Sequence, residues 1–313
     1  MDFDRLDKNV TNFIKNYQFH VSTLATMSNL SKRIFLEELP DADNSYSRQI
    51  DINESIKIVY NFLAEINENM ANQFMNIINS KDENNNPYVN ILPKDKNPNS
   101  NNEVKNGKVY IYYENTPNDP FIILHEMLHK MNECNIINEN NKIGVPITRD
   151  YFSEAVSITG EMMLGNYMIK NNFITENDLN IRKRKRLNGS KERARDVIVE
   201  KELIDLKLQG KKINYENLVN LFSKYDSNSI EYRILSDEKK DLKRINSILN
   251  KNNLNLVRSQ RYVIAQFLSS ELLNRDTLVN DFIKLYYAVG DINSKIMDVY
   301  NDIIYSDTID KII

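Results

Sequence analysis

Apolar residues recur every three or four positions along most of the chain, which is the spacing of helices that bury one face. The clearest run extends over residues 52–78 and predicts one long amphipathic helix. An earlier helix is expected over 5–30. The second half of the chain repeats the pattern and predicts further helices, over 192–208, 215–224, 237–249, 260–273 and 277–287. The fold class indicated is mainly α.

The helical pattern breaks between residues 80 and 107, where asparagine-rich runs favour turns. Two segments beside these runs, 88–92 and 108–113, contain β-branched and aromatic residues, as strands do. The second segment is richer in β-branched and aromatic residues, so it is the better strand candidate. We expect the two to pair as a hairpin and to form a small β-sheet in an otherwise helical protein.

A helix start follows the second strand candidate. Asp119 followed by Pro120 is typical of an N-cap residue with proline at the first helical position. This pair predicts a helix over 119–132. Asp150 is a plausible cap for the next helix, which is expected over 151–171.

The composition supports this fold class and bounds the domain organisation. The 313 residues include seven glycines and seven prolines, and helix interiors exclude both residue types. A chain of this length can bury one large core or two modest ones. We expect a single compact domain over 1–313, with an N-terminal helical part and polar loop over 1–107 and a catalytic part over 108–313.

Charge and hydropathy argue against two classes of partner. A formal net charge of -3 does not favour nucleic acid. No apolar run approaches the roughly 20 residues of a membrane span, and the N-terminus lacks the pattern of a cleaved signal. We therefore expect no membrane partner, and a cytoplasmic protein or one exported without a cleaved N-terminal signal peptide. Cys134 is the single cysteine, so an internal disulfide is excluded.

Two of the three histidines lie four residues apart, as His125 and His129 with Glu126 between them. Positions four apart share one face of a helix, so both imidazoles can point at a single ion. Zinc accepts histidine nitrogen, and two such ligands leave room for a third protein group and a water. Glu126 can take a proton from that water as it attacks a carbonyl. This spacing is typical of zinc metallopeptidases.

The third zinc ligand has several candidates. His20 is far back in the chain, so a carboxylate downstream of His129 is the expected partner. Glu154 is the best placed, because it starts an apolar helix where an unpaired carboxylate would be costly to bury. Asp150 and Glu161 are its rivals. Glu161 lies two helical turns after Glu154, and we assign it the role of orienting a histidine or bracing the site.

The zinc segment resembles the thimet oligopeptidase and oligoendopeptidase F family of zinc peptidases. In that family a threonine and an aspartate precede the His-Glu-x-x-His helix, as Thr116 and Asp119 do here. The family's zinc glutamate follows about 25 residues later in a run Glu-Ala-x-Ser-x-x-x-Glu, which residues 154–161 reproduce. The likeness covers about 108–170, with a weaker echo near 262–273.

The resemblance implies a largely helical, zincin-like fold with a small sheet beside the zinc helix. It further implies a gluzincin mechanism in which His125, His129 and Glu154 hold Zn²⁺ and Glu126 is the general base. Leu128 stands where the family usually has glycine. The family also uses a histidine downstream of the zinc ligands to stabilise the oxyanion, and no histidine follows His129.

Three tyrosines are considered in place of that histidine. The nearest substitute is Tyr262, whose phenol can donate to a developing oxyanion; a core tyrosine is the equal alternative. Tyr286 and Tyr287 are weaker candidates. The basic run Arg182–Arg186 is interpreted as a solvated loop between two helices, rather than as a nuclear-localisation or docking patch.

The function expected from these features is that of a zinc-dependent endopeptidase. Its partner would be a peptide, or an exposed segment of a specific protein, as for a delivered effector or toxin. The alternative is a non-catalytic zinc-containing binding or scaffold protein derived from a peptidase fold. Nucleic-acid binding through the basic run is a weaker option, and the oligomeric state stays open.

Overall fold

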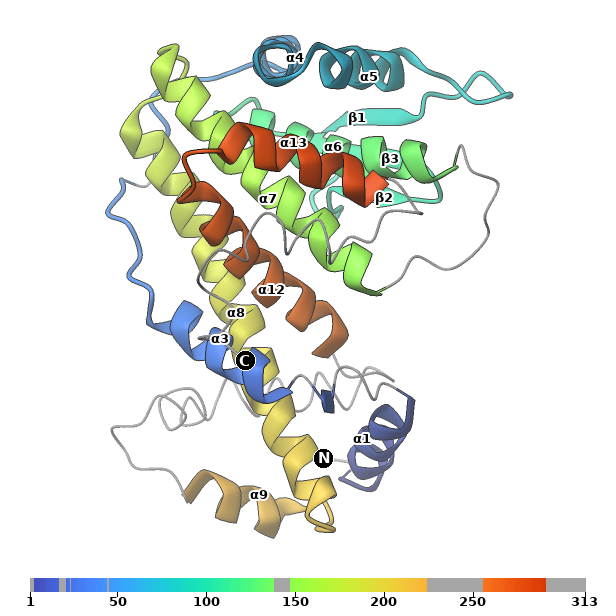
Figure 1. Cartoon of the computed structure of the whole chain (residues 1–313), viewed down its shortest axis with the longest axis vertical. Coiled ribbons are helices and arrows are strands. Elements are labelled where there is room, and N and C mark those ends of the chain that lie inside the picture. The colour runs from blue at the N-terminus through green and yellow to red at the C-terminus, as the bar shows by residue number, and fades with distance from the viewer. Residues whose placement is uncertain are drawn as a thin grey trace. The chain divides into compact units, whose positions relative to one another are not determined.

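The computed structural model describes residues 3–16, 21–22, 24–43, 45–137, 147–223 and 256–290, and most of them lie in helices (Figure 1). Contacts group the chain into two compact units. Unit 1 comprises Met1–Glu38 and Arg186–Ile264, and unit 2 comprises Leu39–Lys185 and Ala265–Ile313. The boundary expected at 107–108 lies inside unit 2. A single domain over the whole chain stays a prediction.

Unit 1 contains the helices α1 (Phe3–Asn16), α3 (Leu24–Leu36) and α9 (Tyr215–Ser223), with parts of α8 (Glu176–Leu208) and α12 (Leu256–Leu273). The helix expected over 5–30 corresponds to α1 and the start of α3. Asp7 on α1 accepts hydrogen bonds from Lys207 Nζ on α8 at 2.9 Å and from the backbone N–H of Ile213 at 2.7 Å. These bonds fasten α1 to the end of α8. The helix expected over 237–249 lies outside the described residues.

Unit 2 begins with two helices where one was expected. The prediction of a single helix over 52–78 is wrong, because the chain breaks at Asn67 between α4 (Ile52–Ile66) and α5 (Glu68–Asn79). Asn67 has extended backbone angles, φ -163° and ψ 118°, and its side chain accepts from the N–H of Met70. An asparagine side chain competes for backbone amides in this way and so favours helix starts. Both helices bury apolar positions, so the periodicity continued across the break.

The sheet has three strands, in the order β1 (Val89–Pro93), β3 (Lys108–Tyr113), β2 (Glu103–Lys105). The predicted hairpin is wrong, because β1 and β3 pair in parallel. The hairpin joins β2 and β3 instead, around Asn106 and Gly107. Both turn residues have positive φ, 52° and 72°, as a two-residue hairpin turn requires. The Asn-Gly pair was the sequence signal for this hairpin.

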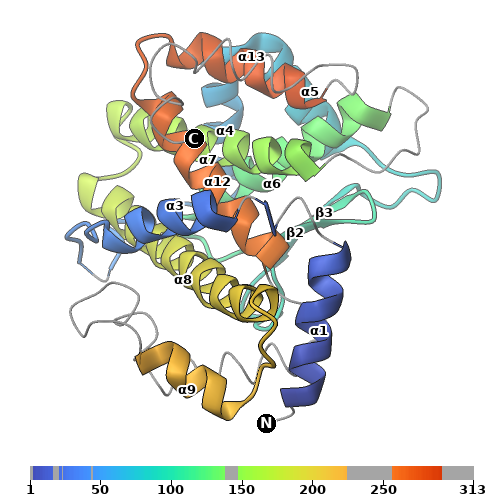
Figure 2. The same cartoon turned by 60° about the horizontal axis from the view of Figure 1, so that its bottom comes forward.

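The centre of unit 2 is the pair α6 (Asp119–Ile137) and α7 (Ile147–Lys170). Helices α4 and α13 (Leu278–Gly290) contact both of them (Figure 2), and the sheet contacts α6 through β2 and β3. The small sheet therefore lies beside the helix of the two histidines, as expected. The start of α6 at Asp119 is confirmed, whereas α7 begins four residues before the expected start.

The two helices approach closely at one glycine. A Cβ added to Gly160 on α7 would lie 2.7 Å from Leu128 Cδ1 on α6, well inside van der Waals contact. Leu128 is fully buried, so its side chain occupies the space that Gly160 leaves. The bulky residue on α6 is thus accommodated by the absence of a side chain on α7.

The turn before α6 is held by Asp119. Its carboxylate accepts hydrogen bonds from the backbone N–H groups of Glu114 and Thr116, at 3.1–3.2 Å. Asp119 therefore closes the turn that precedes the helix, a different contact from the expected cap. Burial raises the pKa of this carboxyl group, and the backbone donors oppose the rise.

Candidate metal centre

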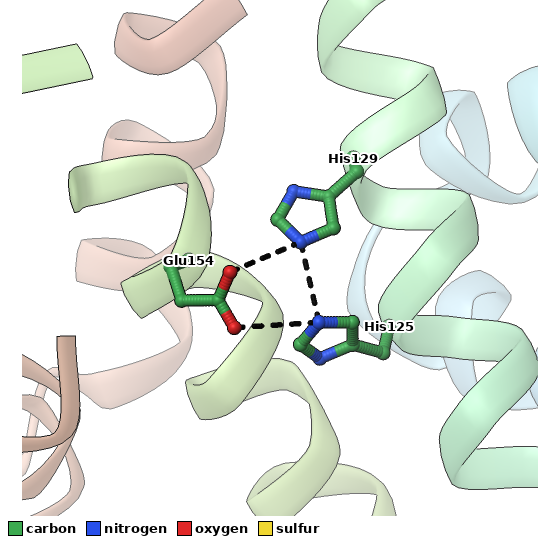
Figure 3. A group of neighbouring side chains, drawn as sticks. All are labelled: His125, His129 and Glu154. Carbon is green, nitrogen blue, oxygen red and sulfur yellow. Dashed lines mark hydrogen bonds and ion pairs between the residues drawn. The ribbon is translucent and has the colours of Figure 1, made fainter. Parts of the chain in front are cut away.

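The two histidines of α6 and Glu154 of α7 converge on one point (Figure 3). One ligand atom from each residue lies within 4.8 Å of the others. Glu154 is 1% exposed, while both imidazoles are partly accessible. Among the described residues, this is the group of histidine, cysteine and acidic side chains that could hold a metal ion.

The spacing of the three side chains fits a tetrahedral ion. The Nε2 atoms of His125 and His129 are 3.2 Å apart, and each lies 3.4 Å from a carboxylate oxygen of Glu154. A tetrahedral zinc with ligands at about 2.0–2.1 Å holds neighbouring ligand atoms about 3.3–3.4 Å apart. The two separations of 3.4 Å match that value and the third is slightly shorter, and two imidazoles with one carboxylate form a donor set that zinc accepts.

The outer nitrogen of each imidazole has its own partner. His125 Nδ1 lies 2.6 Å from Glu161 Oε1, and His129 Nδ1 lies 2.9 Å from Ser153 Oγ. A histidine that donates its Nδ1–H outward keeps the Nε2 lone pair for a metal. The contact expected of Glu161 is therefore present. Ser153 was missed by the sequence analysis, although it directly precedes Glu154.

The run Glu-Ala-x-Ser-x-x-x-Glu presents one face of α7 to α6. Glu154 faces the two Nε2 atoms, and Ser157 Oγ donates to the backbone carbonyl of His125 at 3.3 Å. Glu161 completes the series at His125 Nδ1. The spacing of three and then four residues places all three on one side of a helix. This face therefore joins α7 to the histidine side chains of α6 and also to the backbone of α6 at His125.

Burial and neighbouring charges shift the pKa values of both His125 and Glu126 in the metal-free protein. Burial alone would lower the pKa of His125, but Glu154, Glu161 and Glu126 outweigh it and raise the pKa to about 9 in the metal-free protein. Burial raises the pKa of Glu126, while His125 and His129 oppose the rise. A carboxylate with a raised pKa is a stronger base, as proton abstraction from water requires.

The basic run is helical, so the prediction of a solvated loop is wrong. Residues 182–186 lie within α8, and three of the first four cations have defined partners. Arg182 binds Glu161, Arg184 donates to the carbonyl of Pro40, and Lys185 donates to the Tyr46 hydroxyl. The run is thus part of the packing of α8. An unbroken charge run gives no indication of which of its members fold inward.

Tyr262 and Tyr286, two of the tyrosines considered as oxyanion donors, have different surroundings. Tyr262 lies in the part of α12 that belongs to unit 1, with the guanidinium groups of Arg193 and Arg261 over its ring. Its catalytic role stays a prediction. Tyr286 is fully buried and donates to Gln73 Oε1 at 2.6 Å. That contact gives Tyr286 a structural role.

The remaining residues named from the sequence are Tyr287, Asp150 and Cys134. Tyr287 on α13 is 42% exposed, and its hydroxyl lies 3.5 Å from Asn67 Oδ1. The side chains of Asp150 and Cys134 lie outside the described residues.

Within the described part of the chain, no helix combines the length and apolar character needed to cross a membrane.

Comparison with known proteins gives no relative. No family model, no curated protein and no solved structure matches the chain.

Proposed function

We propose that the protein is a zinc-dependent endopeptidase of the gluzincin type. The observation that carries this proposal is the set of three separations of 3.2–3.4 Å among the Nε2 atoms of His125 and His129 and the carboxylate of Glu154. The position of Glu126 next to the first ligand, and the likeness of residues 108–170 to the thimet oligopeptidase and oligoendopeptidase F family, support it.

The residues divide the work of peptide hydrolysis. His125, His129 and Glu154 would hold zinc, which supplies the Lewis acidity that polarises a carbonyl and makes water more acidic. Glu126 accepts a proton from the attacking water and passes it to the leaving amine.

The substrate class we propose is a peptide or an exposed segment of a protein. Hydrolysis by an activated water needs a carbonyl within reach of the metal and of Glu126. The 18% and 21% exposure of the two histidine side chains leaves the group partly accessible from solvent.

The test compares the wild type with Glu126→Gln on peptide libraries and candidate proteins. Glutamine keeps the size of the side chain and removes the base, so zinc should bind stoichiometrically to both proteins. Cleavage should fall by about 10²–10⁴-fold in the variant. Cleavage undiminished by the substitution would refute the assigned mechanism.

The same assay separates the catalytic proposal from the alternative. Stoichiometric zinc in the wild type, without cleavage of any library member or candidate protein, would favour a non-catalytic zinc protein. Absence of zinc from the wild type after incubation with excess metal would reject both.

A further inference from the structure

Arg182 on α8 is bound to the outer partner of the first histidine. Its Nε and Nη2 atoms both donate to Glu161 Oε2, at 3.1 and 2.5 Å, while the other oxygen, Oε1, faces His125 Nδ1 at 2.6 Å. The two oxygens of one carboxylate thus have separate partners. Glu161 is 3% exposed, and a carboxylate so deeply buried depends on such partners.

The guanidinium group of Arg182 is itself held at the start of α6. Its Nη1 donates to Asn118 Oδ1 at 3.0 Å, and its central carbon lies 5.7 Å from the ring centroid of Phe121. Arg182 therefore contacts α6 and α7 at once, from a third helix. A planar fork bound on three sides has little freedom to rotate.

We propose that Arg182 is a positioning residue of the metal centre. Through Glu161 it holds the ring of His125 in the orientation that turns Nε2 toward His129 and Glu154. This inference rests on the proposed metal site and adds to it a residue from α8. It also assigns a role to the first member of the basic run, which the sequence alone does not distinguish from its neighbours.

The expected consequence is a change in metal affinity. Ligands must be held to within about 0.5 Å of the productive geometry, and the outer partners of a ligating histidine supply that support. Replacing such a partner commonly lowers metal affinity by about 10–100-fold. Because Arg182 acts one residue further out, Arg182→Gln should lower zinc affinity by about tenfold, at the lower end of that range.

Arg184→Gln is a matched control. Arg184 lies on the same helix and is also partly buried, but its Nε and Nη2 atoms donate to the carbonyl of Pro40, at 3.1 and 3.0 Å. Both variants remove one arginine and its paired bonds from α8. We expect the zinc affinity of Arg184→Gln to equal that of the wild type.

The experiment measures zinc affinity by competition with a chelator, and the visible spectrum of the cobalt-substituted protein as a probe of ligand geometry. Unfolding of each metal-free variant reports its effect on the fold alone. Arg182→Lys keeps the charge but lacks the fork, so it should show an intermediate loss of affinity. If Arg182→Gln does not fold, the zinc affinity of Arg182→Lys is compared with that of the wild type instead.

A double-mutant cycle with Glu161→Gln tests the route of the effect. If Arg182 acts through Glu161, its replacement should lower zinc affinity far less in the Glu161→Gln background than in the wild type. Wild-type zinc affinity in the Arg182 variants, equal losses in Arg182→Gln and Arg184→Gln, or fully additive losses in the cycle would each overturn the proposal. Normal zinc binding without peptide cleavage would reject the proposed function and leave this inference standing.

Discussion

Gly160→Ala is expected to destabilise the protein, although alanine is the better helix former. The added Cβ would lie 2.7 Å from Leu128 Cδ1, against an ordinary carbon–carbon contact of about 3.5–4.0 Å. Such overpacking of a core costs about 1–3 kcal/mol, and the gain in helix propensity offsets about 0.5–1 kcal/mol of it. The free energy of unfolding should therefore fall by up to about 2.5 kcal/mol.

The measurement is urea unfolding of Gly160→Ala beside Gly189→Ala. A Cβ at Gly189, within α8, meets no atom within 4 Å, so this control should gain about 0.5–1 kcal/mol. In a Leu128→Ala background the clash is absent, and Gly160→Ala should become stabilising because its methyl group fills part of the space. Equal effects of the two glycine substitutions, or the same sign of Gly160→Ala in both backgrounds, would refute the reasoning.

Three further predictions concern charge and hydrogen bonding. The pKa of His125 is raised from 6.5 to about 9 in the folded, metal-free protein. Protonated His125 therefore stabilises the fold fully below pH 6.5, and this contribution is lost as the pH rises through 9. The unfolding midpoint of chelator-treated protein should fall across that range, and a flat profile would contradict the assignment. Tyr286→Phe removes the hydrogen bond from the Tyr286 hydroxyl to the part-buried Gln73 side chain and should lower the free energy of unfolding by about 0.5–1.5 kcal/mol. Zinc binding and cleavage by Tyr286→Phe should be normal; a selective loss of cleavage would restore Tyr286 as an oxyanion donor. Asp178→Asn weakens the start of α8, where the Asp178 carboxylate accepts hydrogen bonds from Thr175 at 2.8–2.9 Å and from the backbone N–H of Ser47 at 2.8 Å, and should lower the free energy of unfolding by about 1–3 kcal/mol; an unchanged melting temperature would argue against this role.

The inner residues of the site could be predicted because their positions depend on local helix geometry. His125 and His129 share a face whatever the rest of the chain does, since four residues make about one turn. Glu154 and Glu161 required more: the resemblance pointed to Glu154, and helical spacing placed Glu161 on the same face. Ser153 and Arg182 gave no such signal, because a serine or an arginine acquires its role only when another helix packs against it.

The errors in the fold have a common cause, which is that the apolar pattern alone specifies neither which strands pair nor where a helix breaks. The segments 88–92 and 108–113 were recognised as strands, but the choice between a hairpin and a parallel pair depends on the short strand β2 between them. The break at Asn67 was hidden because α4 and α5 both bury apolar residues at helical spacing. In each case one polar residue or pair, Asn67 or Asn106-Gly107, carried the information that the apolar pattern lacked.

An ion shared by α6 and α7 would also act as a cross-link. Cys134 is the single cysteine, so this chain has no internal disulfide. His129 and Glu154 are 25 positions apart in the sequence, and closing a loop of that length removes chain entropy equivalent to on the order of 3 kcal/mol from the unfolded state. Metal bound there would therefore brace the two central helices of unit 2, and a chain cut between residues 129 and 154 would keep them joined.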